Sequence, residues 1–173
     1  EPCAGVATRD EILGDNPRAS AGSTFAGTPA GCAAGLKTLE IYKRDNIVAQ
    51  AASLAELAEQ RMAGWAERYT IVTEVRCLGL LMGISFTHPN RDQMSDDYDD
   101  SWVARTVRNE MLVNGVWAIC DTEPTVRMYP ALNMDQQTFM QALDIIEAAI
   151  QTVEKGAELV GDYPPIPGGV TGF

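Results

Sequence analysis

Apolar side chains recur every three or four positions along much of this chain, which is the spacing of one buried face of an α-helix. The spacing predicts four long helices, over Ala30–Tyr42, Ile47–Arg68, Trp102–Asn114 and Asp135–Lys155. A short helix over Thr8–Leu13 is expected to begin with a capping box. Asp45 is the expected N-cap of the helix over 47–68, and Gly64 within that helix should weaken it only slightly.

Other stretches alternate between apolar and polar positions, or are apolar throughout, as β-strands do. They predict four strands, over Tyr69–Val75, Leu78–Phe86, Val116–Cys120 and Thr125–Tyr129. The second half of the chain therefore has the order β-β-α-β-β-α after a long helix, which favours a small, mainly antiparallel sheet with helices on one face. We expect the apolar stripe of the last helix, Phe139, Leu143 and Ile146, to be buried against this sheet.

Three segments lack either pattern. Asp15–Gly31 is dense in Gly, Ser, Thr, Pro and Ala, a composition typical of loops. His88–Ser101 carries a run of aspartates without the spacing or the glycine of an EF-hand, so a solvated acidic loop is expected. The Pro- and Gly-rich end, Tyr163–Phe173, is expected to be a tail on a surface.

Composition and charge narrow the possible partners. The 173 residues (18.7 kDa) are 46% hydrophobic, enough for one ordinary domain with its own core. Lys and Arg number 13 and Asp and Glu 24, giving a net charge of −11, which argues against nucleic acid or an anionic membrane as the main partner. The longest apolar stretch, around Leu78–Ile84, is too short to span a bilayer, and no secretory leader is recognisable.

The cysteines give no sign of a metal centre. The chain has four, Cys3, Cys32, Cys77 and Cys120, and no two have the CxxC spacing. With a single histidine in addition, we expect no zinc site of ordinary type. Wide spacing in an apolar-rich chain favours reduced thiols and a cytoplasmic location.

One segment has the composition of an anion-binding loop. Hydroxyl side chains and glycines occupy much of 22–31, just before the helix predicted from Ala30. Free backbone N–H groups at a helix N-terminus, next to hydroxyls, attract phosphate. From these residues alone, a purely structural loop is the alternative.

Taken whole, the segment Gly22-Ser23-Thr24-Phe25-Ala26-Gly27-Thr28-Pro29 resembles the GGTF-x-GNP stretch of the class III aminotransferases, the ω-amino-acid branch of the pyridoxal-phosphate enzymes of fold type I. Glu74–Ile84 resembles that family's V-R-G-x-G-L-M-x-G-I/V strand pair. Thr125–Leu132 is similar to its I-R-x-x-P-P-L strand, and Ala4–Ile12 to its G-A-V-x-x-x-x-E-I. The likeness covers about residues 1–155 in the right order.

The resemblance implies an α/β fold of the PLP-dependent transferase type. Residues 1–45 would be the C-terminal end of the large, PLP-binding domain and 46–68 a connecting helix. Residues 69–173 would form the α+β C-terminal small domain with its mainly antiparallel sheet.

The resemblance also implies site residues. Thr24, with Ser23 beside it, would bind the phosphate of pyridoxal 5′-phosphate, in this family within the neighbouring subunit's active site. A homodimer, or a tetramer built from it, is therefore expected. Arg127 matches the arginine that holds the substrate carboxylate, a task for which a planar guanidinium is suited.

This sequence departs from the family pattern at three positions. Thr28 stands where the family usually has Asn, which leaves the fine geometry of the phosphate loop open. Cys77 replaces a usual Gly and Ala131 a common second Pro, and these two changes affect packing and turn shape.

The family's Schiff-base lysine has no match in this sequence and is expected in an upstream remainder of the same enzyme. Lys37, Lys43 and Lys155 match no catalytic position and are expected on helix surfaces. No catalytic residue is therefore assigned within the chain, which is expected to be inactive alone.

The implied reaction is transfer of an amino group from an amino acid or ω-amino acid to a 2-oxo acid, either pyruvate or 2-oxoglutarate. Decarboxylation, racemisation and aminomutation on the same scaffold are alternatives. A further alternative is a non-catalytic fragment that serves at most as a structural or dimer-forming module.

Overall fold

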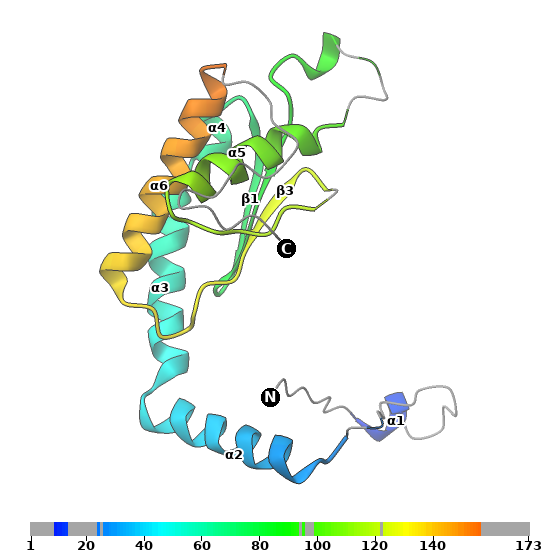
Figure 1. Cartoon of the computed structure of the whole chain (residues 1–173), viewed down its shortest axis with the longest axis vertical. Coiled ribbons are helices and arrows are strands. Elements are labelled where there is room, and N and C mark those ends of the chain that lie inside the picture. Colours follow the sequence, from blue (N-terminus) through cyan, green and yellow to red (C-terminus); the bar gives the residue numbers. More distant parts are fainter. Residues whose placement is uncertain are drawn as a thin grey trace. The chain divides into compact units, whose positions relative to one another are not determined.

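The elements follow one another in the order α1, α2, α3, α4, β1, β2, a short 3-10 helix, α5, β3 and α6 (Figure 1). The computed structural model describes residues 9–13, 24, 26–93, 95, 99–121 and 123–156. The chain divides into two units, Glu1–Ile47 and Val48–Phe173. The expected cap Thr8 and the tail from Tyr163 lie outside the described residues.

The first unit contains α1 (Asp10–Leu13) and α2 (Pro29–Arg44). Proline suits the first turn of a helix because its missing N–H would have no partner there, so α2 begins one residue before the predicted start. Asp45 closes α2, with its backbone N–H donating to the carbonyl of Ile41 at 2.9 Å. The prediction of Asp45 as an N-cap was therefore wrong. Asn46 turns the chain with a φ of 52°, which asparagine tolerates better than most residues.

Gly64 breaks the single helix that was predicted over 47–68. The segment forms α3 (Ile47–Met62) and α4 (Trp65–Arg68), and Gly64 between them has a φ of 75°. A glycine adopts this left-handed conformation without steric cost, so it ends a helix instead of merely weakening it. The apolar stripe persists across the break, and its buried members are Ile47, Leu54, Ala58, Met62 and Trp65.

The described residues of the second unit form a three-stranded antiparallel sheet in the order β1 (Val72–Leu78), β2 (Leu81–Phe86), β3 (Thr125–Met128). The turn between β1 and β2 uses Gly79 at a φ of 60°. β1 begins later than the predicted Tyr69 because the N–H of Tyr69 is bound to the last turn of α4.

The predicted strand Val116–Cys120 does not form. Among the described residues, this segment pairs with β3 only at Ile119, which exchanges both backbone hydrogen bonds with Arg127, at 3.0 and 2.8 Å. One such pair of hydrogen bonds forms an isolated β-bridge, whereas a strand needs several consecutive pairs. Between Gly115 and the bridge, the described residues make no backbone pairing with β3.

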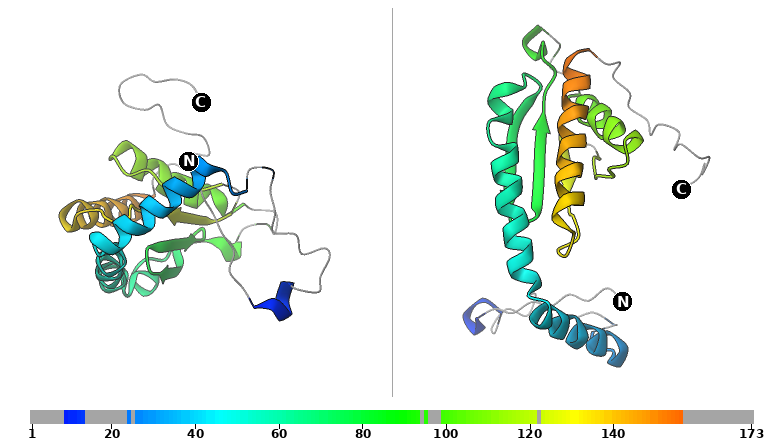
Figure 2. Two further views of the ribbon diagram at one scale, coloured as in Figure 1. Left: turned by 90° about the horizontal axis from the view of Figure 1, so that it is seen from below. Right: turned by 90° about the vertical axis from the view of Figure 1, so that its left-hand side faces the viewer.

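The helices α5 (Ser101–Val113) and α6 (Gln136–Glu154) pack against each other, and α5 also packs on β2 and β3. In the right-hand view of Figure 2, α3 and α6 run lengthwise along the strands. Asp135 caps α6 by accepting the N–H of Thr138 at 2.9 Å. The predicted burial of the last helix is confirmed for Phe139, Leu143 and Ile146, which are 2%, 1% and 2% exposed.

A carboxylate on α6 ties three parts of the second unit together. Glu147 accepts hydrogen bonds from Arg61 at the end of α3, from Arg68 Nη1 at 2.7 Å and from the hydroxyl of Tyr69 at 2.7 Å. Gln151, one turn further along α6, donates to the same hydroxyl at 3.0 Å. Burial disfavours the charged form of Glu147, but the hydrogen bonds and the two arginine charges outweigh it and lower the pKa of this carboxyl. We call these residues the Glu147 cluster.

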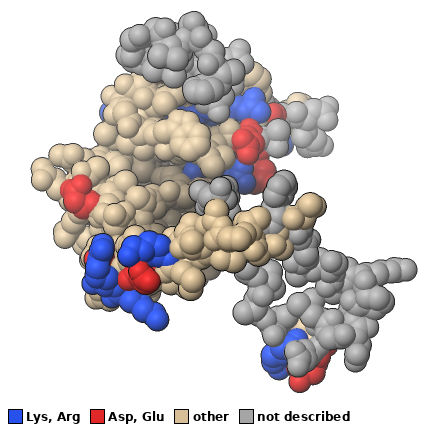
Figure 3. Space-filling view, turned by 60° about the horizontal axis from the view of Figure 1, so that its bottom comes forward, with Lys and Arg blue, Asp and Glu red and all other residues tan. Residues whose placement is uncertain are grey.

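The acidic loop after β2 is partly organised by one of its own aspartates. Asp100 accepts hydrogen bonds from the backbone of His88 at 2.8 Å and from Arg91 Nε at 3.0 Å. Arg91 starts the 3-10 helix Arg91–Gln93. The loop expected to be merely solvated thus contains a half-buried carboxylate that holds both of its ends. On the face shown in Figure 3, most acidic side chains lie in small groups beside basic ones.

Candidate functional site

Arg127 lies on the face of the sheet opposite the core. Successive strand residues point to opposite faces, and its neighbours Val126 and Met128 are buried. Arg127 pairs with Gly83 of β2, and the preceding bridge residue Ile119 flanks it on the other side. The sequence pattern of β3 therefore fixes which way this guanidinium points.

The guanidinium of Arg127 is bound to a carboxylate from the same chain. Its Nη2 donates to Oδ2 of Asp121 at 2.5 Å. The two side chains are 34% and 65% exposed, so the pair lies at the surface. The backbone carbonyl of Asp121 accepts a hydrogen bond from Arg105 Nε at 3.1 Å. The Nε of Arg127 is buried and has no hydrogen-bond partner among the described residues.

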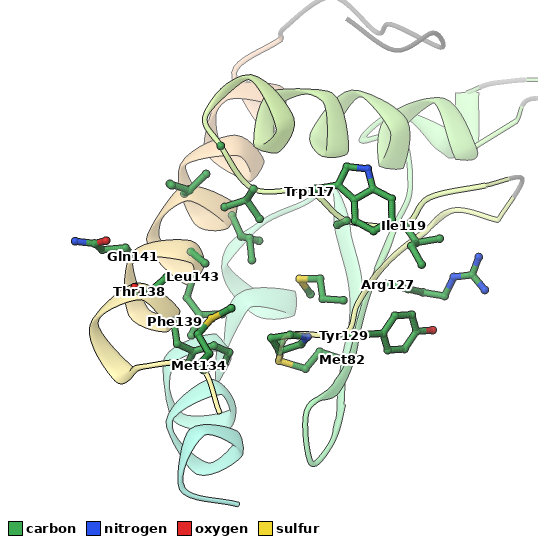
Figure 4. A pocket seen from close by; sticks show the side chains of 18 residues that line it. Met82, Trp117, Ile119, Arg127, Tyr129, Met134, Thr138, Phe139, Gln141 and Leu143 are labelled. Atoms are coloured by element: carbon green, nitrogen blue, oxygen red, sulfur yellow. The ribbon is translucent and has the colours of Figure 1, made fainter. Parts of the chain in front are cut away.

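A cavity of about 390 Å³ lies between the segment before Ile119, the end of β3 and the first turns of α6 (Figure 4). Its lining is mainly apolar and includes Met82, Val116, Trp117, Met128, Phe139, Leu143 and Ile146. Arg127 and Tyr129 also line it, and in Figure 4 their side chains point away from Phe139 and Leu143. The arginine thus stands beside an apolar space of the size that small ligands fill.

Thr24 lies in an exposed turn ahead of α2. The first turn of α2 carries no acidic residue, and the hydroxyl of its cap residue Thr28 makes no capping hydrogen bond. A Cβ added to Gly31 would lie 2.9 Å from Oγ1 of Thr28. Any residue larger than glycine at position 31 would therefore force that hydroxyl to move. Ser23 lies outside the described residues. Thr24 belongs to the first unit and Arg127 to the second.

Comparison with known proteins decides the family. The family model "Aminotransferase class-III" matches residues 2–150. The chain belongs to the class III aminotransferases. The family resemblance drawn from the sequence motifs is therefore confirmed.

Known members show how much of such an enzyme this class III chain represents. A leucine/methionine racemase from Thermococcus litoralis is 27% identical over 161 residues, which are 93% of this chain and 35% of the racemase. The solved acetylornithine aminotransferase of Elizabethkingia anophelis is 25% identical, with a TM-score of 0.64 over 82% of this chain and 33% of that one. The chain spans about a third of the length of the curated relatives it matches.

A second solved structure extends the comparison of the fold. The PLP-bound amine transaminase from an uncultivated Pseudomonas species is 24% identical and shares the fold, with a TM-score of 0.63 over 75% of this chain and 29% of that one. The predicted fold class is confirmed by these matches. Pyridoxal phosphate is the cofactor that membership of the class III family implies. Thr24 and Thr28 provide hydroxyl groups, and the first turn of α2 carries no acidic residue. Such groups have the chemistry to hold the phosphate of the cofactor.

Within the described part of this class III chain, no helix has the length and apolarity to cross a bilayer. The same residues contain no group of three or more metal-ligating side chains.

Asp121 is the site residue that the sequence reasoning missed. It was expected only as the first residue of the turn Asp121–Pro124. If the chain forms a hairpin at this turn, an acidic residue before the turn comes near an arginine after the turn. The sequence therefore contained a signal for this pair. The pairing of Ile119 with Arg127, which sets the actual distance, could not be known without the structure.

Proposed function

We propose that this chain is part of an enzyme that transfers an amino group from an amino acid or ω-amino acid to a 2-oxo acid, either pyruvate or 2-oxoglutarate. The observation that carries the proposal is Arg127, a partly exposed arginine at the edge of an apolar cavity in a class III aminotransferase chain. A carboxylate is common to amino acids and 2-oxo acids, so one such arginine can serve both half-reactions.

Each assigned residue has a separate task. Arg127 holds the carboxylate of the amino donor and then of the acceptor, and so orients the substrate. Thr24 and Ser23 hold the phosphate of the cofactor through hydroxyl and backbone N–H groups. When bound, pyridoxal phosphate supplies a ring that withdraws electrons from the substrate's Cα. We place the lysine that carries the cofactor in an upstream remainder of the enzyme, so that this chain alone is inactive.

The proposed partners are that remainder and a second copy of the enzyme, in a homodimer or a tetramer. In this proposal residues 1–45 are the C-terminal end of the large domain, and residues 69–173 form the small domain. Residues 46–68 connect the two domains. Exposed apolar side chains on the second unit support a contact with further protein, because a solvated surface seldom carries so many together. They are Val48, Leu78, Leu81, Tyr129 and Leu132, which line one apolar groove.

Racemisation is the second candidate. Among the relatives, the Thermococcus litoralis protein is a leucine/methionine racemase, and an isoleucine 2-epimerase from Lentilactobacillus buchneri is 29% identical over 133 residues. A racemase would also hold the substrate carboxylate, so Arg127 is compatible with both reactions. Decarboxylation, aminomutation and a non-catalytic role have no comparable support in the described residues.

The test is an assay of the complete enzyme loaded with cofactor. Amino acids, ω-amino acids and plain amines are offered with pyruvate or 2-oxoglutarate, and the new amino acid is quantified. Formation of the amino acid that matches the acceptor supports transamination. Inversion of an L-amino acid without any 2-oxo acid would establish racemisation instead, and no turnover of any donor would contradict both.

Thr24→Ala should weaken cofactor binding for every substrate alike, because the phosphate is common to all reactions. Loss of one hydrogen bond to a charged group costs about 1.5–3 kcal/mol, roughly a 10- to 150-fold rise in the Kd for pyridoxal phosphate. The Kd is measured by titrating the cofactor into the complete apoenzyme and following its absorbance. Thr38→Ala is the matched control, since Thr38 is exposed on α2 and its hydroxyl bonds to the carbonyl of Ala34. Equal Kd values for both variants would remove Thr24 from the phosphate site.

A further inference from the structure

Two aromatic side chains share the face of the sheet that presents Arg127. The backbone bridge between Ile119 and Arg127 sets the register, and the side chains two positions away from it, at 117 and 129, lie on the same face as the arginine. Burial follows this alternation, because Trp117 is 65% exposed and Tyr129 is 56% exposed, whereas the adjacent Ala118 is buried. The arginine therefore has an exposed indole and an exposed phenol as neighbours on one face.

The two rings stand on opposite sides of the cavity next to Arg127. An antiparallel register through the bridge places position 117 across from position 129. Among the described residues no backbone pairing joins these two positions, and the cavity of about 390 Å³ lies between their segments. Figure 4 shows the rings apart, with Trp117 above Arg127 and Tyr129 below it. The structure thus leaves a space between two aromatic rings.

The rest of the lining is mainly apolar, so the cavity suits an uncharged group. Met82, Phe139 and Leu143 form part of it. An aromatic ring placed between an indole and a phenol can make offset-stacked or edge-to-face contacts with both. Tyr129 also lines the apolar groove that further protein is proposed to cover, and ligand sites occur preferentially at such boundaries between domains.

Arg127 gives this space a charged end. A guanidinium has five N–H donors, and Asp121 accepts a hydrogen bond from Nη2 alone, so donors remain for the carboxylate of a substrate. An α-amino acid carries its carboxylate and its side chain on the same carbon atom. A carboxylate bound to Arg127 therefore brings that side chain within reach of the two rings.

We infer that Trp117 and Tyr129 determine specificity for the amino donor and select a donor with an aromatic side chain. The inference rests on the proposed role of Arg127 in holding the substrate carboxylate. The carboxylate binds Arg127, and the aromatic side chain lies between the two rings. A small side chain, such as that of free alanine, leaves the space between the rings unfilled and gains only the contact with the arginine.

Binding of 3-phenylpropionate and of propionate to the complete enzyme tests the inference without turnover. Both molecules have a carboxylate and neither has an amine, but only the first has an aromatic ring. Trp117→Ala and Tyr129→Ala should each raise the Kd for 3-phenylpropionate about 2- to 12-fold, the range of one aromatic pair, and leave the Kd for propionate unchanged. Tyr129→Phe keeps the ring and should retain the wild-type Kd. Calorimetry measures these values.

Trp102→Ala is the matched control for Trp117→Ala. Trp102 is a tryptophan of α5 that is 40% exposed, and its ring packs on the guanidinium of Arg105, outside the lining of the cavity. The ratio of the two Kd values should therefore stay as in the wild type. Equal weakening of both ligands by Trp117→Ala would make this ring a support for the arginine. Unchanged or tighter binding of 3-phenylpropionate, or its failure to bind the wild type, would remove the rings from the site. Each of these results overturns the inference.

Kinetics of the complete enzyme keep this inference separate from the proposed function. Trp117→Ala should lower kcat/KM for phenylalanine as donor by the same 2- to 12-fold, about the effect on binding, and leave kcat/KM for alanine unchanged. An equal loss for both donors would contradict selection by the rings. If no donor reacts at all, the proposed function fails, whereas the ratio of the two Kd values still tests the rings.

Discussion

Arg127→Ala in the complete enzyme should reduce kcat/KM for carboxylate-bearing donors by about 30-fold to about 5,000-fold. These limits correspond to about 2–5 kcal/mol, the cost of truncating one partner of a hydrogen-bonded charge pair that is buried, as the proposed pair between Arg127 and a bound substrate carboxylate would be. The loss should appear mainly as a higher KM for the amino acid and for the 2-oxo acid, because both present a carboxylate. Steady-state kinetics with a plain amine as donor, at a saturating concentration of the 2-oxo acid, should show a much smaller change.

Arg76→Ala provides the comparison for this variant. Arg76 is an exposed arginine of β1 that pairs with Gly83, the same residue that pairs with Arg127 from the other side. Arg76 therefore carries the same charge on the same sheet, on the strand that lies across β2 from Arg127. If Arg127→Ala slowed plain amines and amino acids equally, the arginine would be a structural residue and the proposed contact with substrate would be wrong.

Glu147→Gln should lower the free energy of unfolding of the chain by about 2–3 kcal/mol. Breaking a buried ion pair by removing one charge costs about 3–5 kcal/mol, and the partial exposure of Arg61 and Arg68 reduces that figure. Glutamine keeps the volume of the side chain, so the effect reports lost charge and not a cavity. Urea unfolding followed by the fluorescence of the fully buried Trp65 measures it.

The effect of Glu147→Gln should depend on pH. The pKa of Glu147 is lowered in the folded chain, so its carboxylate stabilises the fold above the unfolded pKa of about 4.3, and this contribution is lost as the pH falls through the folded pKa. Wild type and variant should therefore differ at neutral pH and converge in acid. Asp144→Asn is the control, because Asp144 binds Arg61 from a side chain that is 64% exposed. A difference that persists unchanged below the folded pKa would show that charge is not the cause.

Local patterns predicted most helices because an amphipathic stripe and its end signals lie within one stretch of sequence. The last predicted helix, Asp135–Lys155, differs from α6 by one residue at each end. Gly64 shows the limit of this reasoning. A glycine inside an apolar stripe can weaken a helix or end it, and the sequence around Gly64 does not distinguish the two outcomes; in the structure Gly64 is left-handed and a new helix starts at the buried Trp65.

The strands and the site depended more on contacts between distant residues. Val116–Cys120 alternates as a strand does, yet strand formation also needs a partner in register, and the described residues provide that partner only at Ile119. The roles of Thr24 and Arg127 came from motif resemblance, since one threonine or one strand arginine has no distinctive pattern. Asp121 could be assigned to the site only from the structure. It lies six positions before Arg127 in the sequence, and their contact follows from the pairing of the two segments in space.

The Glu147 cluster also bears on how the second unit folds during synthesis. Glu147 lies on α6, which comes last among the described elements, whereas Arg61 lies 86 residues earlier. The ribosome therefore releases α3, α4 and the whole sheet before the carboxylate that neutralises their arginines has been made. Until then Arg61 and Arg68 remain solvated and the core lacks Leu143 and Ile146. Native packing of the second unit must wait for α6, and a nascent chain arrested before this helix should be digested readily by protease.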